Sequence, residues 1–246
     1  MILYPAIDIL DGKAVRLQQG EYDQETFYDD DPVDAAKRWA DGGAEYIHVV
    51  DLDGAREGDI ENLATIERIT AAVDCPIEVG GGLRGTEAVG LILEAGAARV
   101  VVGTAALRDP EFLAEIISTH GPSKVVVSVD ARGGKVSLAG WTESSGVDVA
   151  DAVADLSGRG VERFLFTPIE VDGMMTGPNM AELARVAAAT DANVIASGGV
   201  GNLEHLRALA ADAPANVEGV IVGKALYEGK FTVPEAIAAL NEGSSA

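Results

Sequence analysis

The chain has 246 residues, 48% of them hydrophobic, and its 40 acidic and 18 basic residues leave a formal net charge of −22 at pH 7. A surface with this excess of negative charge repels nucleic acid and anionic membranes, so neither is an expected partner. The longest apolar runs have the length of strands, no basic segment precedes an apolar one at the start, and Cys75 is the only cysteine. These features argue against a membrane span, a secretory signal, intramolecular disulfides and a cysteine-based zinc site.

The same features make the cytoplasm the default location, and we expect a monomer. The length suits two small domains or one barrel, and the lack of a linker rich in Pro, Gly or Ser favours one domain. The acidic surface predicts an adaptation to high salt, in which dissolved ions screen the repulsion between carboxylates. An ordinary acidic protein from a low-salt cell is the alternative.

Eight short apolar runs have the composition of parallel strands buried on both faces. They cover residues 2–7, 46–50, 76–79, 99–102, 124–129, 163–167, 193–196 and 219–222. Amphipathic stretches with helical spacing lie between them, at residues 33–41, 62–73, 86–95, 110–119, 148–159, 180–189 and 203–211. Asp-Pro at residues 31–32 and 109–110 and Gly-Pro-Asn at residues 177–179 mark helix starts. This alternation predicts a single-domain α/β fold, the (β/α)₈ TIM barrel. The competitor is an open doubly wound sheet, but no G-x-G-x-x-G follows a strand.

The first half of the chain is repeated in the second. Residues 6–17 reappear as residues 128–138, so that Asp8 corresponds to Asp130, 122 positions later. Four more segments match in the same order, which are residues 53–54 with 172–173, 62 with 179, 79–83 with 196–200, and 101–105 with 221–225. Matched segments in one order indicate an internal duplication, with half-barrels over about residues 1–121 and 122–246.

The repeat places two carboxylates opposite each other. Asp8 ends the first predicted strand and Asp130 ends the fifth, and these strands are diametrically opposed in a ring of eight. Both side chains are then expected at the C-terminal mouth of the barrel, where barrel enzymes carry out their chemistry. Two facing carboxylates can serve as a general acid and a general base. Buried structural aspartates, hydrogen-bonded at strand ends, are the alternative.

Glycine-rich turns after four strands predict two phosphate sites. A glycine at a strand end that leads into a helix exposes backbone N–H groups to an anion. The candidate ligands are Gly81, Gly82, Arg84, Gly103 and Thr104 in the first half, and Ser197, Gly198, Gly199, Gly223 and Lys224 in the second. Their occurrence in both halves predicts an elongated ligand with a phosphate at each end. Glycines that merely permit tight turns are the alternative.

Two arginines and a tryptophan in the loops after strands 1 and 5 are further candidates for ligand contact. Arg16 and Arg132 can clamp an anion, or they can be solvated charges. Trp141 lies in a Gly-rich loop, which predicts stacking on a heterocyclic base, whereas burial beneath its own loop is the alternative.

Two Asp-Gly pairs and one histidine complete the candidate residues. Asp53 and Asp172 each follow a predicted strand and precede a glycine, which suits either ligand contact, together with Gly173, or a turn. The three histidines of the chain lack metal-ligand spacing, so we predict no metal site. His48 is expected in the core or behind the site.

Five segments resemble HisA, the ProFAR isomerase family of histidine biosynthesis. They are residues 5–8, 12–20 (Gly-Lys-x-Val-Arg-Leu-x-Gln-Gly), 48–55, 80–84 and 197–200, and the resemblance runs from Met1 to about Leu240. It implies a barrel of two half-barrels and an Amadori rearrangement of a bisphosphorylated phosphoribosyl aminoaldose. It further implies Asp8 as the base, Asp130 as the acid and Thr167 as a substrate-positioning residue. Such a reaction needs one acid and one base, with no metal or redox cofactor.

The two carboxyl groups then need different environments. An ordinary aspartate, with a pKa of roughly 3.9, is ionised at neutral pH and suits the base. The acid must hold its proton, so we expect burial or a nearby anion to raise the pKa of Asp130.

One departure from the family is visible, and several alternatives remain open. The family often has Asp-Gly-Thr after the sixth strand, where this chain has Met174 in place of Thr, which puts one substrate contact in doubt. The sibling cyclase HisF shares the fold and the Asp pair but usually has Cys-Leu-Asp where this chain has Ala-Ile-Asp. A bifunctional isomerase that also serves tryptophan synthesis, and a non-catalytic phosphoribosyl-binding barrel, are also compatible. A glycoside hydrolase would use two carboxylates, but the aromatic content of 5% is low for sugar platforms.

Overall fold

The computed structural model describes residues 1–18 and 21–243, so Gln19 and Gly20 of the family motif lie outside the described residues. In the described part of the chain, eight parallel strands close into a barrel, because each pairs with the next in chain order and the last with the first. The barrel strands are β1 (Ile2–Leu10), β4 (Ile47–Asp51), β5 (Ile77–Gly80), β6 (Arg99–Val102), β7 (Val125–Arg132), β10 (Arg163–Pro168), β11 (Asn193–Ser197) and β12 (Val217–Val222). The predicted single-domain (β/α)₈ barrel is confirmed, and the open sheet is excluded.

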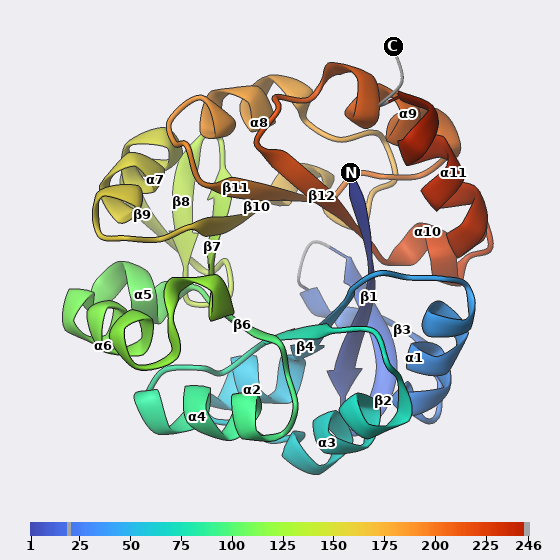
Figure 1. The fold of residues 1–246 in the computed structure, drawn as a ribbon, viewed down its shortest axis with the longest axis horizontal. Helices are drawn as coiled ribbons and strands as arrows, with labels where there is room; N and C mark the ends of the chain where they lie inside the picture. The colour runs from blue at the N-terminus through green and yellow to red at the C-terminus, as the bar shows by residue number, and fades with distance from the viewer. Residues whose placement is uncertain (19–20, 244–246) are drawn as a thin grey trace.

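Helices surround the strands and form the outer layer of the barrel (Figure 1). The longer helices are α1 (Pro32–Asp41), α3 (Leu63–Ala72), α4 (Thr86–Glu94), α6 (Pro110–His120), α7 (Val149–Gly158), α8 (Met180–Ala187), α9 (Leu203–Asp212) and α11 (Val233–Gly243). Short helical turns also follow several strands, namely α2 (Leu52–Glu57), α5 (Thr104–Arg108), η1 (Pro122–Lys124), η2 (Ile169–Val171) and α10 (Lys224–Tyr227). None of the described helices is long and apolar enough to cross a membrane.

Side-chain caps explain where three of the long helices begin. Asp31 accepts a hydrogen bond from the backbone N–H of Val33, and Asp109 caps α6 in the same way, each just before a proline at the first helical position. Asn179 caps α8. These are the helix starts that the sequence predicts. Asn62, the counterpart of Asn179, makes no capping bond, because its side chain binds Asp51 and Asp53 instead.

Two β-hairpins extend the barrel at its mouth, within the long loops that the sequence predicts after strands 1 and 5. One consists of β2 (Lys13–Gln18) and β3 (Glu21–Asp29) after β1, and the other of β8 (Lys135–Leu138) and β9 (Glu143–Asp148) after β7. The second strand of each hairpin is polar, and the first strand is short, with large apolar side chains at only two alternating positions such as Val15 and Leu17, so the apolar pattern of these segments is too weak to predict strands. The first hairpin follows Asp8 in the chain and brings Arg16 to it. The second follows Asp130 and brings Trp141 to it.

The space inside the barrel is filled below the mouth. Its apolar interior is a small cluster separate from the main core between strands and helices, made of Tyr4, Ala6, Val101, Val126, Leu165, Ile195 and Ile221. Side chains alternate along a strand, so Asp8, two residues beyond Ala6, points to the same interior face at the mouth. The barrel is therefore a packed support for a site at its open end.

Matched positions in the two halves share backbone geometry. Gly103 and Gly223 both have a φ of −110°, and Gly82 and Gly199 have φ values of 73° and 83°. Such likeness is what an internal duplication would leave, and the half-barrel boundary near residue 121 stays a prediction.

Candidate active site

Asp8 and Asp130 lie near the C-terminal ends of β1 and β7, four strands apart in the ring of eight described strands. Asp8 is 8% exposed, and Asp130 is half-buried. The structure thus brings the two aspartates to opposite sides of the mouth, as the repeat predicts.

The carboxylate of Asp8 is paired with a cation. Arg16 on β2 donates from Nη1 to Oδ1 of Asp8 over 2.8 Å, and both side chains are largely buried. Burial raises the pKa of Asp8, and the charges of Arg16 and His48 oppose that rise. The expectation of an ordinary pKa for Asp8 is therefore wrong, since the strand end that positions the group also removes it from water.

Asp130 is held by neutral donors instead. Ser128 donates from Oγ to Oδ1 over 2.9 Å, Trp141 donates from Nε1 to Oδ2 over 2.8 Å, and Thr167 on the neighbouring strand adds a third hydrogen bond. Burial raises the pKa of Asp130, and these three donors oppose it. The predicted direction is confirmed, with burial as the cause.

A third carboxyl group, that of Asp172, belongs to the same mouth. Burial raises its pKa to about 6, Arg16 lowers it, and the neighbouring carboxylates of Asp8 and Asp130 raise it further. Three acidic side chains and one arginine thus influence one another here.

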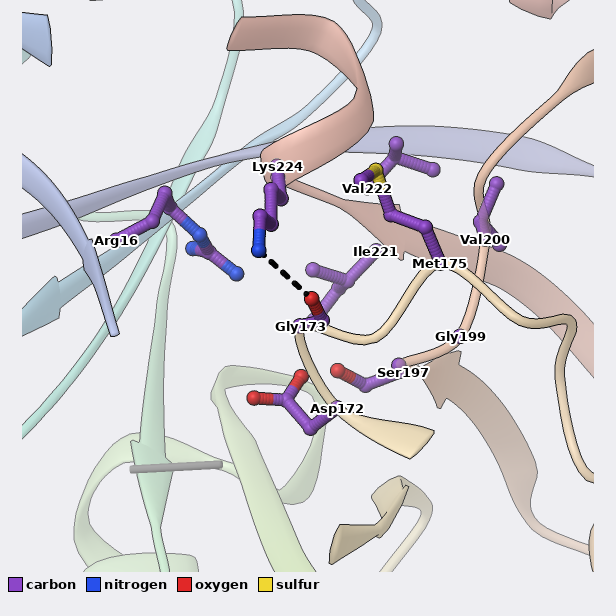
Figure 2. Close-up of a pocket in the computed structure, with 12 residues that line it drawn as sticks. Arg16, Asp172, Gly173, Met175, Ser197, Gly199, Val200, Ile221, Val222 and Lys224 are labelled. Carbon is purple, nitrogen blue, oxygen red and sulfur yellow. Dashed lines mark hydrogen bonds between the residues drawn. The ribbon is translucent and has the colours of Figure 1, made fainter. Parts of the chain in front are cut away.

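A pocket beside these groups collects the second-half candidates for phosphate binding (Figure 2). It is lined by Arg16, Asp172, Gly173, Met175, Ser197, Gly198, Gly199, Val200, Ile221, Val222, Gly223 and Lys224. Lys224 donates from Nζ to the carbonyl oxygen of Gly173 over 3.1 Å. The guanidinium of Arg16 lies against Gly223, where a Cβ would come within 2.3 Å of its Cζ. The pocket therefore combines two cations with glycine backbone, a chemistry that suits a phosphate.

The first-half candidates after β5 and β6 lie away from this pocket. Arg84 is exposed and donates to the carbonyl oxygen of Ala55 over 3.1 Å. Thr104 accepts the backbone N–H of Ala139 at its Oγ1 over 3.0 Å, which ties α5 to the hairpin of Trp141. The side chains of Arg84 and Thr104 thus already have partners within the protein. Gly103, in contrast, has open space beside it, since a Cβ added there would have its nearest neighbour, Ser128, at 3.9 Å.

The glycines in these turns are also required for the close packing of neighbouring loops, whether or not the turns bind an anion. A Cβ on Gly81 (φ +102°) would lie 2.1 Å from the carbonyl oxygen of Asp51, and one on Gly82 would lie 2.5 Å from that of Gly54. In the second half, Gly199 is similarly close to Gly177, but a Cβ on Gly198 would lie 3.4 Å from the Cα of Asp172. Only Gly198 of this set has room beside the pocket, so the first-half glycines are explained by the close approach of two loops.

Several other candidates are assigned by their contacts. Asp53 accepts hydrogen bonds from the backbone of Asp11, from Asn62 and from Arg56, so it joins α2 to its surroundings, and its contact with a ligand stays a prediction. Arg132 is exposed at the end of β7, and Met174 is 37% exposed. His48 is buried, as expected, with its Nδ1 2.8 Å from Oε1 of Glu78.

Four residues at or below the mouth were not predicted from the sequence, namely Ser128, Met175, Glu78 and Tyr227. Ser128 had a usable signal, because it lies two residues before Asp130 and therefore on the same face of β7. Tyr227 had none. Its ring stacks on Tyr28 with a centroid distance of 4.6 Å, and its hydroxyl is buried without a partner among the described residues. The described residues contain no cluster of His, Cys, Asp and Glu suited to a metal ion.

Comparisons with known proteins agree on one family. The family described as "Histidine biosynthesis protein" matches residues 2–232. A protein of Brevibacillus brevis is 48% identical over 96% of this chain and 94% of its own length, and one of Rhodospirillum rubrum is 46% identical over 98% and 99%. A protein of Desulforudis audaxviator is 48% identical over 97% of this chain and 90% of its own length. All three are named 1-(5-phosphoribosyl)-5-((5-phosphoribosylamino)methylideneamino)imidazole-4-carboxamide isomerase.

Proposed function

Because this chain belongs to the histidine biosynthesis protein family, we propose that it catalyses the reaction for which its relatives are named, the isomerisation of ProFAR to its ribulosyl isomer PRFAR. The chain is an isomerase of histidine biosynthesis that acts on a phosphoribosyl compound. The observation that carries the detailed proposal is the meeting of two opposed carboxyl groups with a cationic pocket at one mouth.

The reaction proceeds through proton transfers at one ribose. An acid protonates the ring oxygen as its bond to C1 breaks, and the lone pair of the amine nitrogen forms a C=N bond to C1, which opens the ring. A base then removes the proton from C2 to give an enaminol, and the loss of the proton from the C2 hydroxyl with protonation of C1 gives the aminoketose. Asp8 is the proposed base. Its pairing with Arg16 favours the ionised form against the burial that raises its pKa.

Asp130 is the proposed acid because it faces Asp8 across the mouth and burial raises its pKa. Asp172 is a second candidate for this step. Its pKa of about 6 keeps a fraction of the group protonated near neutral pH, whereas the donors around Asp130 stabilise a carboxylate. The high-pH limb of the kcat profile distinguishes the two, because only the variant that lacks the acid loses that limb.

Phosphate binding is proposed at both ends of the substrate. The support is stronger in the second half, where Arg16 and Lys224 converge on Gly198 and Gly223. In the first half, the backbone beside Gly103 and Thr104 is the proposed counterpart, with Gly81, Gly82 and Arg84 around it. Between them, Trp141 and Thr167 are proposed to contact the substrate body beside Asp130.

An absorbance assay with ProFAR, followed by mass spectrometry of the product, tests the function. We expect turnover without added cofactor and a product of unchanged mass. A product that forms only with ammonia and has a changed mass would indicate the cyclase reaction. Binding of ProFAR without turnover would indicate a barrel that only binds phosphoribosyl compounds and would overturn the proposal.

A further inference from the structure

A cluster of charged and aromatic side chains fills the barrel below the mouth, and the proposed function does not use it. Its members are Tyr4, Tyr46, His48, Glu78, Arg99, Arg163 and Glu218. Arg163 binds both carboxylate oxygens of Glu218, at 2.5 and 3.0 Å. Arg99 lies 3.5 Å from Glu218 and stacks over the ring of Tyr46 at 4.4 Å from its centroid.

The end of this cluster at His48 and Glu78 lies directly beneath the candidate catalytic groups. Neighbouring strands pair Ala6 with His48, His48 with Glu78, and Glu78 with Arg99, so these residues form one layer of the barrel interior. Asp8 is two residues beyond Ala6 and belongs to the next layer towards the mouth. His48 is among the groups that act on the pKa of both Asp8 and Asp130, in each case against the larger effect of burial.

Glu78 is an unusual residue in this layer because it is fully buried and only half satisfied. It is 0% exposed, its Oε1 is 2.8 Å from Nδ1 of His48, and its Oε2 has no hydrogen-bond partner in the described part of the chain. The nearest cation to Oε2 is Nη1 of Arg99, at 3.9 Å. A buried carboxylate with this geometry costs stability relative to an apolar side chain. Packing alone therefore gives no reason for its charge.

His48 presents its other ring nitrogen without a partner. Nδ1 faces Glu78, and no hydrogen bond to Nε2 is found among residues 1–18 and 21–243. A carboxylate bound to one ring nitrogen fixes the orientation and tautomer of an imidazole and makes the other nitrogen a defined group. His48 lies close enough to both candidate catalytic aspartates to lower the pKa of each, so this nitrogen belongs to the layer directly beneath the mouth.

We propose that Glu78 is a positioning residue for the isomerisation. It holds the His48 ring through Nδ1, and Nε2 then hydrogen-bonds the substrate hydroxyl beside the carbon from which Asp8 removes the proton. By holding the ring in place, Glu78 also keeps His48 beside Asp8, whose pKa His48 lowers. This inference rests on the proposed isomerase function, because it assigns Glu78 a part in that reaction.

The test replaces Glu78 by an uncharged residue of the same shape. Glu78→Gln is expected to lower kcat about 10- to 100-fold, the range found when the partner that orients a metal-bound histidine is removed, with little change in KM. Its low-pH limb of kcat should move to higher pH. The groups that face Asp8 are Arg16, His48, Asp172 and Tyr227, and only His48 touches Glu78.

Glu218→Gln is the matched control. It removes a carboxylate from the same cluster and breaks the pair with Arg163, but it does not contact His48. We expect a lower melting temperature with unchanged kcat and an unchanged pH profile. If Glu78→Gln behaves in this same way, Glu78 is structural and the proposal is overturned.

A double-mutant cycle with His48→Leu shows whether Glu78 acts through the histidine. In the His48→Leu background, Glu78→Gln should lower kcat no further, and an additional loss would contradict the proposal. If Glu78→Gln alone does not fold, the comparison is His48→Leu with His48→Leu/Glu78→Met, in which both partners are apolar, and equal kcat is expected. Wild-type kcat in His48→Leu also overturns it. Lack of ProFAR turnover by the wild-type protein would instead contradict the proposed isomerase function itself.

Discussion

The two halves of the barrel use the same scaffold to build different surroundings for matched residues. Asp8 is bound by the cation of Arg16, whereas Asp130 is bound by the neutral donors Ser128 and Trp141. The carboxylate of Asp53 accepts hydrogen bonds from the backbone of Asp11 and from Asn62, whereas its counterpart Asp172 lines the pocket. An internal repeat therefore supplies equivalent positions, and the side chains that the hairpins bring to them decide the chemistry. A substrate that has a phosphate at each end but reacts at only one ribose would require such a scaffold, with equivalent positions in the two halves and different side chains around them.

The largest expected effect concerns the two opposed aspartates. Asp8→Asn keeps the shape of the side chain but cannot accept the proton, so kcat should fall by at least about 100-fold, the low end for general acid–base catalysis. Asp130→Asn should show a similar fall with substrate affinity largely retained. Steady-state kinetics with ProFAR measure both. Near-wild-type kcat in either variant would remove that aspartate from the mechanism.

The matched glycines should differ in what their substitution damages. In Gly81→Ala the new Cβ meets the backbone of Asp51 in the left-handed region, which should lower the free energy of unfolding by about 2–5 kcal/mol. In Gly198→Ala only the backbone strain applies, about 1–2 kcal/mol, and KM should rise because the methyl group faces the pocket. Chemical denaturation and kinetics separate the two effects. Equal losses of stability would show that both turns are purely structural.

The partners of the two aspartates should be distinguishable by pH. Arg16→Gln removes the cation that opposes the burial of Asp8, so the pKa of Asp8 should rise and the low-pH limb of kcat should move upward. Trp141→Phe removes a hydrogen-bond donor from Asp130, so the pKa of Asp130 should rise as well. The limb of the kcat profile that reflects Asp130 should therefore also move to higher pH. We expect a loss of about tenfold in kcat at neutral pH for Arg16→Gln, equal to about 1.4 kcal/mol. Profiles identical to that of the wild type would refute the assignment.

Asp53 and Asp172 should affect stability with opposite signs. The pKa of Asp172 rises from 3.8 to about 6 on folding, so the folded state binds its proton more tightly than the unfolded chain does. Stability is then undiminished below about pH 4 and declines as the pH rises towards the folded pKa. Asp172→Asn removes this cost, which we expect to raise the free energy of unfolding at pH 8 by about 1–2 kcal/mol, after allowance for partial exposure.

The same substitution at pH 4 should have little effect, which provides the internal control. Asp53→Asn should instead destabilise the protein at pH 8, because its carboxylate accepts hydrogen bonds from Asp11, Asn62 and Arg56. Thermal unfolding at the two pH values measures all four differences. A stabilised Asp53→Asn, or a destabilised Asp172→Asn at pH 8, would show that the two aspartates do not differ as described.

Salt should act on the surface that both halves share and leave their buried differences unchanged. The net charge of −22 predicts that the melting temperature rises as the Debye length falls from about 10 Å at 0.1 M to about 3 Å at 1 M salt. Stronger apolar burial in salt adds to this trend, so variants with several surface Asp or Glu residues changed to Lys are the control. These variants should need less salt. A melting temperature that does not change with KCl would contradict our proposal of a salt-adapted surface.

Much of the fold was predictable because it depends on local patterns. The buried parallel strands appear as continuous apolar runs, and prolines with capping aspartates mark the starts of α1 and α6. The repeat predicted that Asp8 and Asp130 would oppose each other, since ring closure relates the first and fifth strands. The strands of the hairpins β2–β3 and β8–β9 were not predicted, because β2 and β8 are short and β3 and β9 are polar, so their apolar pattern is weak, and they form by pairing with the ends of β1 and β7.

The sequence alone therefore determined the barrel, its repeat and the places of the two candidate catalytic aspartates, because hydrophobic periodicity and chain order are sufficient to specify them. The tertiary structure decided which partner each aspartate has, that Arg16 reaches both Asp8 and the pocket, and that Asp53 is hydrogen-bonded to Asn62 whereas Asp172 lines the pocket. It also decided that Glu78 lies against His48 below the mouth. These outcomes depend on contacts between residues far apart in the chain, and such contacts form only when the strands close into a ring.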